Sequence, residues 1–136
     1  MQKNFDVGFI VSILGSIVTY LLGGIDSLLQ VLLIFMVVDY ITGLAKGYVK
    51  KELNSTIGFR GLLKKALILF VLIVAVQLDK VAETEQAFRT VVAWFYIGIE
   101  GISLLENSAE IGLPVPKKLL DALKIFKDRG EERKLE

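Results

Sequence analysis

The stretch that decides the fold is VGFIVSILGSIVTYLLGGI, residues Val7–Ile25, which contains no charged residue. A helix of about 20 apolar residues crosses a hydrocarbon core of about 30 Å. A secretory signal peptide is the alternative, but it needs a basic start and a small-residue cleavage site after a shorter apolar run. Lys3 is the only basic residue before the stretch, and no A-x-A pattern follows it. The stretch therefore predicts a retained membrane-spanning helix.

Three further apolar runs follow, at residues 28–45, 62–78 and 87–105, and each is shortened or interrupted by charge. Residues 67–76 alone favour insertion by about 3 to 6 kcal/mol, whereas one central carboxylate costs about 2.5 to 3.5 kcal/mol. A soluble bundle is the alternative, but helices that are apolar on nearly every face leave too few polar faces to cover them. We therefore predict an all-α integral membrane protein with four transmembrane helices in two hairpins, the first at about residues 7–25.

The basic residues predict the orientation. Of the 16 Lys and Arg residues, all but Lys80 and Arg89 lie before the first run, in the segment 46–65 between the second and third runs and at its borders, or after the fourth run. Because Lys and Arg collect on the cytoplasmic side, both termini and the loop 46–65 are expected in the cytoplasm. A three-span model would leave one apolar run at the surface or in a re-entrant hairpin, and would place one basic block on the wrong side.

The connecting segments divide the chain into two predicted parts. Residues 1–106 form the transmembrane domain, in which Asp26 can cap the second span and Asn54 precedes a later helix. Residues 107–136 are predicted to form a cytoplasmic amphipathic helix and a charged tail, with Pro116 in the first helical turn. Such a helix can lie on an anionic membrane surface, and a solvated tail is the alternative.

Composition argues against an enzyme and against nucleic-acid binding. The chain has no Cys and no His, which excludes disulfides, thiolate nucleophiles, Cys/His metal sites and His-based triads. No glycine-rich phosphate loop is present, and the net charge of +1 is too small to indicate a nucleic-acid partner. We expect no cofactor and no metal. A small ion channel or transporter subunit and a structural membrane scaffold remain as alternatives to a pore former.

Charged and polar residues inside the apolar runs are the first candidates for function, because an intramembrane acid usually faces a partner or a water-filled cavity. Asp39, Thr42 and Lys46 share one helical stripe. Snorkelling to the membrane surface is a strong alternative for Asp79 and Glu106, and a weak one for Glu100. The pore-lining candidates are Asp39, Thr42, Lys46, Asp79, Glu100 and Glu106.

Small residues at helical spacing are the second group of candidates, because they let two helix backbones approach closely. The alternative is that they pack the helices of one chain together. The candidates for helix packing or oligomerisation are Gly8, Ser12, Ser16, Gly43, Gly47, Gly98 and Gly101.

A series of motifs across residues 28–125 resembles the toxin-secretion/phage-lysis holin family. It begins with DYITGLAK at residues 39–46 and continues with N-S, G-x-x-G-L-x-K-K, S-x-x-E-N and G-x-P-x-P in that order. One departure is Ile99, where the family tends to carry Asn. Besides Asp39, Thr42, Gly43 and Lys46, the motif residues are Asn54, Ser55, Gly58, Gly61, Lys64, Lys65, Asn107, Gly112, Pro114 and Pro116.

This resemblance implies a holin of the bacterial cytoplasmic membrane. Such a protein forms homo-oligomers in the bilayer and opens lesions that release an endolysin, or in some relatives a large toxin, without contacting them. An antiholin, which restrains a holin, fits the same pattern and is also a partner to consider. We expect Asp39 and Glu100 to be paired, protonated or turned inward in the idle protein, and to face water once an assembly opens.

Overall fold

The computed structural model describes residues 2–119 and residue 121, with the side chains described from Val7 onward. Within these residues the chain is helical and has no strand. The helices are α1 (Gln2–Leu21), α2 (Ser27–Val49), α3 (Ser55–Ala82) and α4 (Ala87–Glu110). The predicted all-α class is therefore confirmed for this part of the chain.

Two of the predicted caps begin helices as expected. The Asp26 carboxylate accepts a hydrogen bond from the Leu29 amide at 2.9 Å, and the Asn54 side chain accepts one from Ile57 at 2.9 Å. Both side chains satisfy an amide that would otherwise lack a partner in the first turn. Helices α2, α3 and α4 reach beyond the predicted apolar runs at one or both ends, whereas α1 ends at Leu21, before the predicted end at residue 25.

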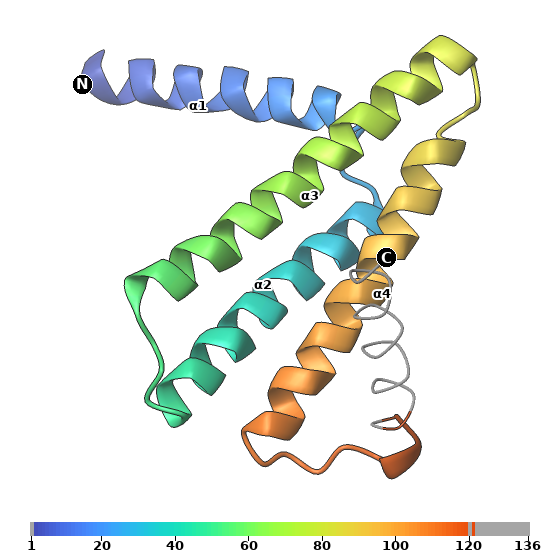
Figure 1. Ribbon diagram of the computed structural model, residues 1–136. Coiled ribbons are helices and arrows are strands. Elements are labelled where there is room, and N and C mark those ends of the chain that lie inside the picture. The colour runs from blue at the N-terminus through green and yellow to red at the C-terminus, as the bar shows by residue number, and fades with distance from the viewer. Residues whose placement is uncertain (1, 120, 122–136) are drawn as a thin grey trace.

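Helices α2, α3 and α4 pack together, and α4 contacts both of the others. Helix α1 points away from these three helices in Figure 1. The antiparallel packing of α1 along α2, expected for the first hairpin, is therefore not seen in the described residues. The chain turns at Gly23 and Gly24, whose φ angles of 75° and 98° suit glycine and redirect the backbone between the two helices.

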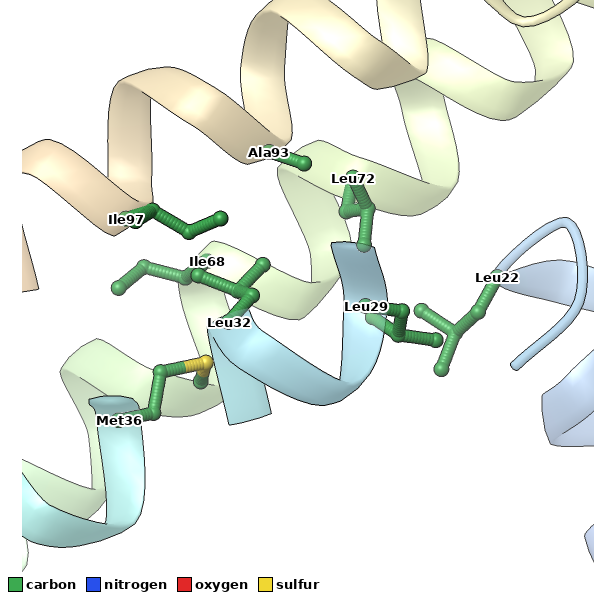
Figure 2. Packing of buried hydrophobic residues seen from close by; sticks show 8 residues of the cluster. All are labelled: Leu22, Leu29, Leu32, Met36, Ile68, Leu72, Ala93 and Ile97. Carbon is green, nitrogen blue, oxygen red and sulfur yellow. The ribbon is translucent and has the colours of Figure 1, made fainter. Parts of the chain in front are cut away.

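The apolar core lies between α2, α3 and α4 and reaches the end of α1 through Leu22 (Figure 2). Leu32 of α2 and Leu72 of α3 are completely buried. The other members of the cluster come from the same helices and their junction with α1: Leu22, Leu29, Met36, Ile68, Ala93 and Ile97. The core is narrow, so most apolar side chains of these helices point outward.

Three of the described helices, α2, α3 and α4, are long and apolar enough to cross a membrane. In the most apolar part of each, no more than 22% of the residues are buried inside the protein. Large side chains such as Phe70, Val91 and Trp94 are more than half exposed. Exposed apolar surface of this extent fits a helix surrounded by lipid rather than by water.

The span predicted at about residues 7–25, which corresponds to α1, remains a prediction. The apolar part of α1, Val7–Leu21, is shorter than a typical spanning helix. Its Ser12 and Ser16 hydroxyls donate to the carbonyls of Gly8 and Ser12 at 2.8 Å, so these polar groups are satisfied within the helix. This internal bonding is compatible with an apolar environment.

The predicted division after residue 106 also remains a prediction, since α4 continues to Glu110. Gly112, with φ 92°, lies in the turn that follows α4. Beyond Pro114 and Pro116, a helical turn at residues 117–119 is present. Most of the predicted amphipathic helix and the charged tail lie outside the described residues.

Candidate functional site

A buried ionic cluster joins the three packed helices near the end that carries the α2–α3 loop. We call Asp39, Lys65, Glu100 and Asn107 the Lys65 cluster. The Lys65 ammonium from α3 forms ion pairs with the carboxylates of Asp39 on α2 and Glu100 on α4. Asn107 donates through Nδ2 to Asp39 Oδ1 at 3.1 Å. Each helix therefore contributes a group that another helix satisfies.

The charges of the Lys65 cluster do not balance, because two carboxylates share one ammonium. The side chains of Asp39, Lys65 and Glu100 are 11%, 16% and 5% exposed. Charges this deeply buried are costly unless they are paired and hydrogen-bonded. Every fully buried polar side-chain atom in the described part of the chain does have a hydrogen-bond partner.

A second cluster holds the opposite end of the bundle together and centres on Arg89. The Arg89 guanidinium, 1% exposed, donates to both Asp26 carboxylate oxygens at 2.8 and 3.0 Å. It also donates to the carbonyls of Leu22 at 2.7 Å and Gly24 at 2.9 Å. We call Asp26, Asp79 and Arg89, with these two carbonyls, the Arg89 cluster. It ties the α1–α2 turn to the start of α4.

Asp79 completes the Arg89 cluster by capping α4 from the end of α3. Its carboxylate accepts hydrogen bonds from the backbone amides of Phe88 and Arg89 at 2.9 and 2.8 Å. Negative charge at a helix N-terminus is favourable, because the first amides have no partner within the helix. Asp79, predicted as a pore-lining candidate, is 5% exposed, and both of its carboxylate oxygens accept hydrogen bonds within the protomer.

The Arg89 guanidinium also changes the acidity of Asp26. Its hydrogen bond to the Asp26 carboxylate lowers the pKa of Asp26 from 3.8 to about 2, although burial opposes the change. A hydrogen bond to the ionised form and a nearby positive charge both favour the carboxylate. Asp26 is therefore the ionised partner of Arg89 at neutral pH.

The structure separates the other predicted pore-lining residues. Thr42 lies beside the Lys65 cluster, where Asn107 Nδ2 is 3.4 Å from its hydroxyl. Lys46 instead forms an ion pair with Glu110 on α4 at 3.4 Å. Glu106 is half-buried on α4. Their role in lining a pore stays a prediction.

The predicted packing glycines fall into two groups by what lies opposite them. Gly43 faces Asn107, Gly47 faces Leu53 of the next loop, and Gly101 faces the Phe35 ring. Gly43 and Gly101 thus face another helix of the same protomer, and Gly47 faces the loop after its own helix. The assignment of the seven small residues to helix packing or to oligomerisation stays a prediction. In contrast, no atom lies within 4 Å of a side chain added at Gly8 or Gly98.

The motif glycines of α3 receive an aromatic side chain from α2. A β-carbon added at Gly61 would lie 3.1 and 3.2 Å from the Tyr40 ring, and one at Gly58 would lie 3.6 Å from the Tyr40 hydroxyl. The Tyr40 hydroxyl is 3.3 Å from the Gly58 carbonyl oxygen, to which it donates. The G-x-x-G spacing therefore forms the surface on which Tyr40 rests. Asn54 caps α3, and Ser55 is its first residue.

Sequence reasoning missed the roles of three residues. By sequence, Lys65 counts as part of the basic loop 46–65 and Arg89 as one of two basic residues outside the cytoplasmic groups, yet both are central to a buried cluster. Asn107 was noted only as a motif residue. Each follows or interrupts an apolar run, and this position is the one available signal, because it forces a long polar side chain to find a partner nearby.

No group of three or more possible metal ligands occurs within the described residues. The site is instead a set of ion pairs and hydrogen bonds at the two ends of an apolar core. Such an arrangement holds three helices in one packing and keeps their charges away from lipid.

Comparison of the sequence with known proteins shows the family of this chain. The model of the bacteriophage holin family matches residues 16–128. An uncharacterized 14.9 kDa protein in the nagH 3′ region of Clostridium perfringens is 52% identical over 82% of this chain and 85% of its own length. An uncharacterized protein of Listeria monocytogenes is 42% identical over 87% of this chain and 84% of its own.

A relative with a functional name is the probable holin of Bacillus phage phi105, which is 32% identical over 84% of both chains. No solved structure matches this chain. The matched region contains both buried clusters and all three helices of spanning length. No enzymatic family is indicated, and the chain belongs to the bacteriophage holin family, a family of membrane proteins.

Proposed function

We propose that this chain acts as a holin: it oligomerises in the bacterial cytoplasmic membrane and forms non-selective lesions that release an endolysin or a large toxin. Family membership and the probable holin among its relatives support this role. The proposed topology places both termini in the cytoplasm, as the distribution of basic residues predicts.

The observation that carries the mechanism is the unbalanced charge of the Lys65 cluster. In the packed protomer, Asp39 and Glu100 share Lys65 and lie away from lipid. An excess carboxylate costs up to about 2.5 to 3.5 kcal/mol inside a membrane, the value for the centre of a spanning helix, and less toward the interface. When many protomers assemble around water, the same residues can line the wetted wall and this cost disappears. The cluster thus favours opening once enough copies meet.

The membrane potential gives this switch a trigger. Moving one elementary charge across 100 mV is worth about 2.3 kcal/mol. The Lys65 cluster carries net charge inside the membrane segment, so depolarisation changes the balance between the packed and the assembled protomer.

The decisive experiment is induction of the protein in a bacterium with and without a co-expressed endolysin. We expect lysis, followed as loss of turbidity, only when the endolysin is present. A selective ion current without enzyme release would favour a small channel, and unaffected growth in both strains would favour a scaffold. Delayed lysis on co-expression with an active holin would favour an antiholin.

The variant Asp39→Asn tests the role of the Lys65 cluster. It leaves Lys65 paired with Glu100 alone, removes the excess negative charge, and should lengthen the delay before lysis. Glu52→Gln is the matched control, because Glu52 is exposed in the α2–α3 loop. Unchanged timing and unchanged sensitivity to an uncoupler would remove Asp39 from the mechanism.

A further inference from the structure

A cavity of about 200 Å³ lies between α2 and α3, and Asp39, Lys65 and Asn107 of the Lys65 cluster form part of its lining. Its apolar walls include Leu44, Ile57 and the Tyr40 ring, and its basic residues are Lys46, Lys64 and Lys65. A second cavity, of about 280 Å³, lies between α3 and α4 and is also lined by Lys64 and Lys65. The two adjacent lysines of α3 therefore border both spaces.

The lysines that line this cavity differ in whether a carboxylate of the protein already pairs with them. Lys65 is paired with both Asp39 and Glu100. Lys46 shares a single carboxylate, that of Glu110, with Lys50, and its own contact to Glu110 is the longer one at 3.4 Å. Lys64 is exposed and makes no ion pair or hydrogen bond within the described residues. The one carboxylate lining the cavity, Asp39, is occupied by Lys65 and Asn107. The cavity lining therefore carries three lysines against one carboxylate, and among the described residues Lys64 has no carboxylate partner.

The position of the cavity limits what can enter it. It lies near the end of α2 and the start of α3, both of which are helices of spanning length. In the topology proposed above this end of the helices faces the cytoplasm, so a ligand there would meet lipid on one side and water on the other; an anionic head joined to an apolar chain suits such a place. Basic pockets between transmembrane helices bind anionic phospholipid headgroups for this reason.

We propose that the cavity between α2 and α3 binds one anionic phospholipid, whose phosphate contacts Lys64 and Lys46 and whose acyl chain follows Leu44 and Ile57. This site holds lipid against the packed protomer and does not depend on lesion formation. One lipid molecule is then a specific ligand of the protein, whereas the rest of the bilayer only surrounds the helices.

The test uses the full-length protein in detergent, with lipid binding measured by native mass spectrometry. Phosphatidylglycerol should bind at one molecule per protomer, at least fivefold more tightly than phosphatidylcholine, and inorganic phosphate should not displace it. Equal binding of the two lipids would overturn the proposal, as would full displacement by inorganic phosphate, which would indicate a site for free phosphate.

Two variants assign the effect to this cavity. Lys64→Gln should weaken phosphatidylglycerol binding about fivefold, the effect expected of one Lys near an anionic surface. Arg60→Gln is the matched control, because Arg60 lies one turn earlier on α3, is exposed, and does not line the cavity. An equal loss in both variants would show unspecific surface attraction and overturn the proposal. Circular dichroism of each variant confirms that the helices remain folded.

Discussion

Replacing Arg89 by Met should be among the most destabilising single changes in this chain. The guanidinium is 1% exposed and donates to Leu22, Gly24 and Asp26, so its removal leaves two carbonyls and a carboxylate without their donor. Breaking a buried ion pair by removing one partner costs about 3 to 5 kcal/mol. Because the Asp26 side chain is 48% exposed, water can reach it again and reduce the loss.

We therefore expect Arg89→Met to lower the free energy of unfolding by about 3 kcal/mol, which is roughly a 150-fold change in the equilibrium constant. The measurement is reversible unfolding in mixed micelles by added dodecyl sulfate, followed by circular dichroism. Lys80→Met is the matched control: Lys80 is exposed at the same end, and its ammonium lies 3.8 Å from the Tyr20 ring centroid. That cation–π contact contributes about 0.5 to 1 kcal/mol at an exposed site.

The reasoning would be refuted if the two variants differed by less than about 1 kcal/mol, the usual value of an exposed ion pair. A double variant, Arg89→Met with Asp26→Asn, adds a second check. If the two residues act as one pair, its effect should be clearly smaller than the two single effects added together.

Two further predictions concern packing and pH. Gly61→Ala should destabilise the protein by about 1 to 3 kcal/mol, because the added β-carbon would press on the Tyr40 ring. The control is Gly98→Ala, which faces open space and should be neutral or stabilising by up to about 1 kcal/mol. Equal effects of the two variants on the unfolding midpoint would contradict this prediction. Because the folded pKa of Asp26 is lowered from 3.8 to about 2, its contribution to stability should be complete above about pH 4 and lost as the pH falls toward 2. Asp26→Asn should be less stable than the parent protein at neutral pH and should lose less stability over this pH range, which an unfolding series at stepped pH measures.

The helices, their caps and their membrane character could be read from the chain itself. Apolar runs such as residues 28–45 are about as long as a membrane-spanning helix, which satisfies its own backbone hydrogen bonds in lipid. Asp26 and Asn54 cap helices through contacts within three residues, so local sequence contains all that is needed.

Tertiary structure alone decided which charges meet. Lys65 pairs with Asp39 and Glu100, which are 26 and 35 residues away in the chain, and Arg89 reaches the turn 63 residues before it. No periodicity encodes such distances, since each pairing depends on how the helices rotate and cross. The same packing decided that α1 leaves the bundle and that Gly43 and Gly101 serve contacts within one protomer. Hydropathy is a property of each residue and can be evaluated from the sequence alone. The neutralisation of a buried charge requires a partner that only the folding of the chain brings close.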